Sequence, residues 1–441
     1  MARKNIALLA LEGEQMIEDQ LPVEGAEVVA DQIEASPEAE LVEMQEIAQE
    51  MDDIEAARDE GMDTVETMGR VEEKLEEAID ESGGIDPIAA EAIKICLEHM
   101  QCRMTGGTVM KTFALEGFKS KTTRIQATNM AMESFKETAK KVWDGIIATI
   151  QRAMKAVKEF FARFFDAAKK QAYRAEQLAK AAEAKKEAKV EGKVKAQAIL
   201  RLDNKFIEGI TLQDALKDNH MTIQNQALYG IGVSDRFVSV AEKALKKAVE
   251  GGDDAEFKEL EAALTELCGG LKEKGDGKYE SSTLIGDIII KAELVLEKAK
   301  LTVAMSDSAA KKDMEPAEID AVEPAKVAEI AKTVKAQMED LAKAQDEIKK
   351  IEKAHVGLLS AIKKGFQAGM NASKAGGKGK DGINNAGLAI TAINSFISFS
   401  STFVSRAKQY EASVASAALA YGAASLKLAS GDKSKTAVVS A

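Results

Sequence analysis

A long apolar stripe in the middle of the chain limits the possible folds more than any other feature. Between residues 143 and 168, apolar side chains recur at alternating steps of four and three residues, with basic side chains between them. This spacing places them on one face of an α-helix and is the pattern of a heptad seam. A helix of this kind has to bury its stripe against other helices. The stripe consists of Trp143, Ile147, Ile150, Met154, Val157, Phe161, Phe164 and Ala168.

A second stripe of similar period runs from Val327 to Phe366, and Pro324 is well placed to begin its helix. Aromatic residues make up only 5% of the 441 residues, there are five prolines, and no convincing alternating strand pattern is present. This composition is typical of long helices. The sequence therefore predicts a mostly α protein, an elongated multi-helix body with long heptad-like helices and no substantial sheet. Several shorter helices are expected between Ile199 and Met314.

The charge of the chain changes sign near residue 116. Residues 1–116 contain 8 basic and 30 acidic residues, a net charge of −22, whereas residues 117–441 contain 52 basic and 43 acidic residues, a net charge of +9. Residues 117–201 alone carry a net charge of +11. Such an asymmetry indicates an acidic segment with its own role. Alternatively, an acidic helix neutralises a basic neighbour within one stable fold.

These patterns divide the chain into four parts. Residues 1–116 are expected to form an acidic N-terminal propeptide, and residues 117–200 a basic, aromatic-rich amphipathic helical segment. Residues 201–370 are expected to form a helical body. Residues 371–441 contain a Gly/Lys loop followed by C-terminal helices rich in small residues.

The change of charge coincides with the sequence Ala114-Leu115-Glu116-Gly117, which repeats the Ala-Leu-Glu-Gly at residues 10–13. The helix breakers Gly106 and Gly107 precede it, and a protease needs accessible backbone. Cleavage after Glu116 would convert a precursor of charge −13 into a product of charge +9, which is attracted to a polyanion. We therefore predict a processing site here, with Glu12 as a candidate earlier cut.

The stripe around Trp143 has three alternative interpretations. It is the core of the protein's own fold, a face that docks on a partner protein, or a face that binds a membrane surface, since a basic amphipathic helix with Trp and Phe suits an interface. The candidate partner or membrane face comprises Trp143, Ile147, Ile150, Met154, Phe161 and Phe164. The basic residues near the cut and along this helix are candidates for nonspecific contact with DNA phosphates. They are Lys119, Lys121, Arg124, Lys155, Lys158 and Arg163.

Catalytic and metal-binding patterns are weak. Cys96, His99 and Cys102 are spaced to share a helix face, but a zinc site would need a fourth ligand. His355 falls on an apolar helix face and is expected to be a core or boundary histidine. No paired acid and base or nucleophile arrangement is apparent. We therefore expect neither an enzyme nor a bound metal or cofactor.

Compartment and membrane signals are also limited. Three cysteines cannot form a disulfide framework, which favours a reducing compartment such as the cytoplasm. The apolar run at residues 6–11 is too short for the core of a secretory signal. Residues 382–405 are uncharged and long enough to span a bilayer, but their Asn, Ser and Thr residues favour packing between helices instead.

Three features together resemble the internal head proteins of phiKZ-like giant bacteriophages. They are the acidic leader ending in Ala114-Leu115-Glu116, the following basic GFKSKTTR, and the aromatic helix VWDGIIATIQRAMKAVKEFFARFF. The resemblance implies a structural protein of the virion interior, in the inner body of the head. It also implies that a prohead protease cuts after a small-x-Glu sequence, removes an acidic propeptide and leaves the body with the packaged DNA. Its partners would be that protease, other internal head or capsid proteins and DNA, with a homo-oligomer as a further option.

Some alternatives remain open at the level of sequence. Small-x-Glu also occurs at residues 48–50, 181–183 and 248–250, so the motif by itself does not select the cut. The chain could instead be an assembly scaffold of the prohead core that is lost from the particle. It could also be a membrane-active protein delivered with the genome.

Overall fold

The computed structural model describes most of the chain beyond residue 82 and shorter stretches before it. The described residues are 49–50, 52–57, 60–61, 64, 67–68, 70–71, 74–75, 77–78, 83–105, 112–120, 122–250, 255–309, 311–312, 316–343, 345–374 and 380–429. The predicted early cut at Glu12 and the predicted DNA contact Lys121 lie outside the described residues.

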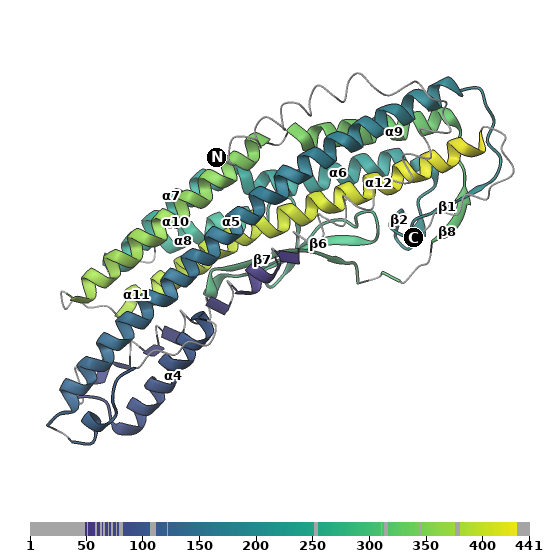
Figure 1. Ribbon diagram of the computed structural model, residues 1–441. Coiled ribbons are helices and arrows are strands. Elements are labelled where there is room, and N and C mark those ends of the chain that lie inside the picture. Colours follow the sequence, from purple (N-terminus) through teal and green to yellow (C-terminus); the bar gives the residue numbers. More distant parts are fainter. Residues whose placement is uncertain are drawn as a thin grey trace, which may run out of the picture.

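One helix, α5 (Arg124–Ala184), organises the molecule. It is 61 residues long, or roughly 90 Å at 1.5 Å per residue, and it runs nearly the full length of an elongated body (Figure 1). No proline interrupts it, and the first proline after Pro87 in the chain is Pro316. Its buried face includes the predicted stripe, so the amphipathic pattern explains why this segment forms a helix and where it packs.

The other helices pack either against α5 or against its neighbours, as α6 does on α9 and α7 on α10. Helix α9 shares the longest interface with α5, and α4, α12 and α10 also contact it. These helices are α4 (Pro87–Thr105), α6 (Gly209–Gly232), α7 (Ser234–Glu250), α8 (Ala255–Glu266), α9 (Pro324–Lys343), α10 (Gln345–Lys374), α11 (Lys380–Ser398) and α12 (Val404–Leu428). A π-helical turn (Phe399–Phe403) joins α11 to α12. Short 3₁₀ turns occur at Glu116–Phe118 and Leu296–Lys298.

Proline and aspartate mark the beginnings of two of these helices. Pro87 and Pro324 are the first residues of α4 and α9, where the missing N–H of proline costs no helical hydrogen bond. The Asp86 carboxylate accepts hydrogen bonds from the backbone N–H groups of Ile88 and Ala89, at 2.8 and 2.9 Å. This side-chain cap satisfies two of the donors that a helix start leaves free.

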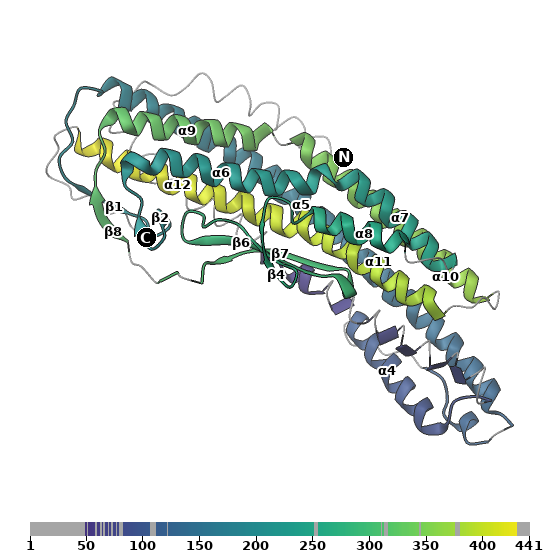
Figure 2. The same cartoon turned by 180° about the vertical axis from the view of Figure 1, so that it is seen from behind.

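A four-stranded antiparallel sheet lies along one side of the helices, as Figure 2 shows from behind. Its order is β4-β5-β6-β7, and the last strand contacts α11 and the π-helical turn. Two further pairs of strands, β1 with β8 and β2 with β3, are also antiparallel. The strands are β1 (Lys193–Ala196), β2 (Arg201–Leu202), β3 (Lys205–Phe206), β4 (Lys272–Gly275), β5 (Lys278–Glu280), β6 (Ile288–Val295), β7 (Lys300–Asp307) and β8 (Ala317–Asp320).

Tight turns with positive φ angles connect these strands. Asp203 and Asn204 both have positive φ between β2 and β3, and Asp276 and Gly277 both have positive φ between β4 and β5. Two consecutive residues of this kind form the two-residue hairpin turns that match the twist of antiparallel strands. At Gly277 a Cβ would lie 2.2 Å from the Leu294 carbonyl oxygen. Both this close approach and the positive φ angle therefore require glycine there.

The buried apolar residues form one cluster that extends from Ile54 to Leu426. At its centre, four phenylalanines of α5 pack against one another, with neighbouring ring centroids 5.3 to 6.4 Å apart. They are Phe160, Phe161, Phe164 and Phe165, each less than 10% exposed. Burying one such side chain contributes about 1.5 to 3 kcal/mol, so this cluster is a major stabilising element.

The structure confirms a mostly α fold and modifies its details. Helix α4 ends at Thr105, just before the predicted helix breakers Gly106 and Gly107, and Pro324 begins a helix as expected. The absence of substantial sheet is not confirmed, because residues 272–307 form the four-stranded sheet rather than helices. The stripe beyond Val327 is divided between α9 and α10.

Candidate processing site

The predicted processing site lies in a short surface arch that leads into α5. Phe113 and Phe118 anchor the two ends of the arch, with ring centroids 5.5 Å apart and exposed fractions of 6% and 0%. Between them, Ala114 and Glu116 are exposed, whereas Leu115 is partly buried and packs against the core. The two residues that define a small-x-Glu sequence therefore face solvent together, and the unspecified residue faces inward.

Several contacts fix the exit of the arch. The Thr123 hydroxyl donates a hydrogen bond to the Gly117 carbonyl oxygen at 2.7 Å, and the Arg124 Nε donates to the Phe118 carbonyl oxygen at 3.3 Å. A Cβ on Gly117 would lie 2.8 Å from the Ala127 Cβ, so glycine permits the close approach to α5. The Glu116–Phe118 turn is 3₁₀-helical, with the Phe118 N–H bonded to the Leu115 carbonyl oxygen at 3.2 Å.

The competing small-x-Glu sequences lie in different surroundings. Residues 181–183 belong to α5 and residues 248–250 to α7, and Gln49 and Glu50 are helical as well. Another match, residues 321–323, precedes α9 outside any helix. There, however, the Ala321 N–H bonds to the Gly192 carbonyl oxygen at 3.0 Å, and Val322 is buried.

The acidic segment before the arch packs on the N-terminal half of α5 (Figure 1). This segment contributes buried apolar residues to the common core from α4, from the helical residues before it and from Ile85 between them. These are Ile54, Met68, Val71, Leu75, Ile85, Ala90, Ile93, Leu97 and Met100. The chain therefore holds its acidic and basic segments together through apolar packing, in addition to any attraction of charge.

The apolar face predicted on α5 is part of the protein's own core. Trp143, Ile150, Phe161 and Phe164 are 8% exposed or less, and the partly buried Ile147 and Met154 pack against the same cluster. This is the first of the three interpretations given by the sequence. In this conformation the face is not offered to a partner or a membrane, because other helices of the chain cover it.

The predicted DNA-contacting residues are divided between two places. Lys119 is exposed at the arch, and the partly buried Arg124 holds the arch in place. Lys155, Lys158 and Arg163 are exposed further along α5, beginning about 31 residues and roughly 46 Å from Arg124. They share the solvent face of α5 with Arg152, Lys169 and Lys170, whereas only Glu159 and Asp166 are acidic between residues 152 and 170.

The groups considered for chemistry do not form a reactive centre in the described residues. His355 is 1% exposed and hydrogen-bonded to the Ser400 hydroxyl at 2.7 Å, as expected of a core histidine. Among the described residues, no group of three His, Cys, Asp or Glu side chains is placed to hold a metal ion. Burial raises the pKa of the Cys268 thiol to about 12, which makes it a poor nucleophile.

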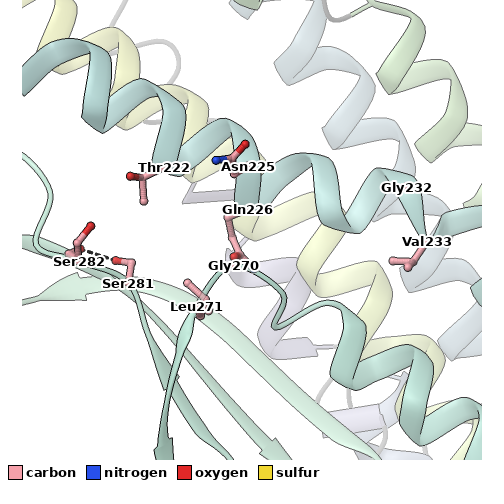
Figure 3. A pocket seen from close by; sticks show the side chains of 9 residues that line it. All are labelled: Thr222, Asn225, Gln226, Gly232, Val233, Gly270, Leu271, Ser281 and Ser282. Carbon is pink, nitrogen blue, oxygen red and sulfur yellow. Dashed lines mark hydrogen bonds between the residues drawn. The ribbon is translucent and has the colours of Figure 1, made fainter. Parts of the chain in front are cut away.

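A cavity of about 610 Å³ opens between α6 and the β5–β6 connection (Figure 3). Its described lining carries polar but uncharged side chains, among them Asn225, Gln226, Ser281 and Ser282. The Gln226 Nε2 donates to the Leu267 carbonyl oxygen at 2.7 Å, which joins α6 to the end of α8. The described lining contains Ser and Thr hydroxyls but no carboxylate, imidazole, ammonium or thiol group that would activate them as nucleophiles.

One helical stretch of the described chain, Gly387–Leu428, has the length and hydropathy of a membrane span. Two thirds of its most apolar window is buried inside the protein, which is what a core helix of a multi-helix body shows. The Ser395 hydroxyl also has a partner within the fold, because it accepts a hydrogen bond from the Leu301 N–H at 2.9 Å.

Comparison with known proteins places the chain in one family. No curated protein and no solved structure matches it. Residues 28–429 match the phiKZ-like phage internal head proteins, a range that covers nearly the whole chain and both sides of the arch. The matched range contains residues 28–116 of the acidic segment, the arch and α5, and the chain belongs to the phiKZ-like phage internal head proteins.

Proposed function

We propose that this structural protein of the head interior is made as a precursor and cut after Glu116 by the prohead protease. Residues 117–441 then remain in the head with packaged DNA and other internal head proteins. The observation that carries the proposal is the arch at residues 113–118. It presents Ala114 and Glu116 to solvent outside any α-helix or strand, while helices hold the matches at 181–183 and 248–250.

The charge distribution supports the consequence of such a cut. Loss of residues 1–116 removes a net charge of −22 and leaves +9, with the exposed basic face of α5 intact. A positively charged product is attracted to the phosphate backbone without reading its sequence. This attraction should decrease steeply with salt, because each neutralised phosphate releases condensed counterions.

The first test is the N-terminus and intact mass of the protein in purified particles and in cells that express it alone. We expect particle-derived protein to begin at Gly117 and the isolated precursor to remain whole. A full-length chain in particles would show that the acidic segment is a permanent part of the protein. Absence of the protein from mature particles would favour a scaffold that is lost.

A matched pair of variants separates this site from other small-x-Glu sequences. Glu116→Gln should leave the full-length protein in particles. Glu183→Gln changes the same motif within α5 and should be processed like the wild type. Normal processing of Glu116→Gln would place the cut elsewhere.

A further inference from the structure

The interface between the acidic segment and α5 has the character of a folded core. On α4, Leu97 and Ala90 are fully buried and Met100 is 3% exposed. On α5, Phe135, Val142 and Ile146 are each 2% exposed or less within the same apolar cluster. Before α4, Gly61 lies so close to α5 that a Cβ there would approach the Ile146 side chain to 3.2 Å.

Buried hydrogen bonds reinforce this packing at both ends of α4. The Ile85 N–H donates to the Thr128 hydroxyl at 3.1 Å, and the Gln101 Nε2 donates to the Thr138 hydroxyl at 2.8 Å. Both bonds join residues before position 116 to residues after it. Separation of the two pieces would break them and expose their apolar surroundings to water.

The acidic segment also reaches beyond α5. Asp52 forms an ion pair with Arg406 of α12, and Glu55 accepts a hydrogen bond from the Ser398 hydroxyl at the end of α11. A cut in the arch at 113–118 leaves every one of these contacts untouched, because none of them depends on the peptide bond after Glu116.

We infer that the N-terminal half of α5 is a binding groove for the chain's own excised segment, residues 49–116, and that a cut after Glu116 yields a nicked two-piece protein. The inference rests on the proposed cleavage for its biological setting. The nicked protein keeps the total charge of the precursor, −13, because both pieces remain together. The change to +9 requires a second event that removes the segment, either further cuts within it or its unfolding.

The inference can be tested without the phage protease. A recognition sequence for a site-specific protease is inserted after the exposed Lys119 of the full chain, and the purified protein is cut to completion. Size exclusion and native mass spectrometry at low micromolar concentration should then give a single species containing both pieces. The nicked protein should also elute from a DNA column at the same salt concentration as the uncut protein. Separation of the pieces under these native conditions would overturn the inference.

Two substitutions on opposite faces of α4 provide a matched comparison. Leu97→Asp places a charge in the buried interface, whereas Ile95→Asp changes a side chain that is 60% exposed. After cutting, Leu97→Asp should release the acidic piece and Ile95→Asp should retain it as the wild type does. Retention by Leu97→Asp at wild-type strength would overturn the assignment of this face.

Circular dichroism of the uncut Leu97→Asp protein checks that it remains helical. If it does not, the nicked wild type and Ile95→Asp still decide the result. The proposed cleavage is judged separately by the N-terminus found in particles. A chain that is never cut in the phage can still form a stable nicked complex in this assay, and a chain that is cut can fail to form one.

Discussion

Gln101 and Thr138 form a buried hydrogen bond, 2.8 Å long, between a residue of the acidic segment and a residue of the basic helix. The Thr138 hydroxyl in turn donates to the Ser134 carbonyl oxygen one turn earlier in α5, at 2.9 Å. Each hydroxyl or amide here has lost contact with water, so each depends on its protein partner. The acidic segment is therefore integrated into the core of the full chain.

Gln101→Ala should destabilise the full chain by about 1 to 3 kcal/mol, because it leaves a buried polar partner without its hydrogen bond. Chemical denaturation of the full chain measures the change. Gln126→Ala, at an exposed position of α5, should change stability by less than about 0.5 kcal/mol. Equal losses of stability in the two variants would mean that the Gln101–Thr138 hydrogen bond does not stabilise the fold.

Gly117→Ala should destabilise the arch by about 1 to 3 kcal/mol, because the new Cβ collides with the Ala127 Cβ. Local opening then makes the peptide bond after residue 116 more susceptible to limited proteolysis. The double variant Gly117→Ala/Ala127→Gly lacks the opposing Cβ. Its loss of stability should therefore be smaller than the sum of the losses in the two single variants. Strict additivity in this double-mutant cycle would contradict a direct contact.

Glu176 should contribute acid-sensitive stability to the α5–α9 interface. Hydrogen bonds from Lys180 and Lys335, at 2.7 and 2.9 Å, lower the pKa of Glu176 from 4.5 to about 2. A lowered folded-state pKa gives stability that is present above pH 4.5 and is lost as the pH falls towards 2. Glu176→Gln should therefore flatten the decrease of stability in this window. At neutral pH Glu176→Gln should lower the stability by less than about 1 kcal/mol, since the Glu176 side chain is 36% exposed and its ion pairs are screened by solvent.

Thermal unfolding between pH 2 and pH 7 measures this difference. Glu187→Gln, an exposed carboxylate close to the end of α5, serves as the control and should follow the wild type. High salt should reduce the effect of Glu176→Gln. An unchanged pH profile for Glu176→Gln would show that the two lysine contacts do not form in solution.

Thiol reagents should distinguish the cysteines of the intact protein. Cys102 is exposed on α4, whereas Cys268 is 3% exposed and burial raises its pKa to about 12. At pH 8, Cys102 should react first and Cys268 only on unfolding, because the thiolate is the reactive form. Cys102→Ser should remove the fast phase. Rapid modification of Cys268 in the native protein would contradict its place in the core.

The sequence predicted the long helices well because their apolar periodicity is set by the geometry of a single element. The stripe from Trp143 to Phe164 needs no knowledge of its neighbours to be read as a helix face. The sheet was missed for the opposite reason. Every residue of β4 is exposed and shows no alternation, and the apolar run Ile288–Ile290 fits a buried helix or strand equally well. The Asp276-Gly277 pair is a hairpin signal within residues 199–314, for which the sequence analysis predicted shorter helices.

The position of the processing site stays a prediction, and the tertiary contacts around it could not be predicted from the sequence. A small-x-Glu sequence at a change of charge pointed to residues 114–117, whereas the anchoring roles of Phe113 and Phe118 arise from tertiary packing. The sequence does contain a signal for this anchoring, namely the two phenylalanines on either side of the motif. The packing of the acidic segment on α5 could not be predicted from charge, because the contacts that bind it are apolar and depend on which faces meet.

The placement of α5 would give the proposed maturation a mechanical consequence. The beginning of this helix extends past the ends of α10 and α11 and has the acidic segment as its neighbour there (Figure 1). Residues 124–150 span roughly 40 Å, and a helix of this length has little stability in water without a packed face. Loss of the acidic segment would convert one end of a stiff rod into an unsupported arm with an apolar side. The mature protein would then differ from its precursor in length and flexibility, and its free arm could span the distance to a neighbouring molecule in a crowded head.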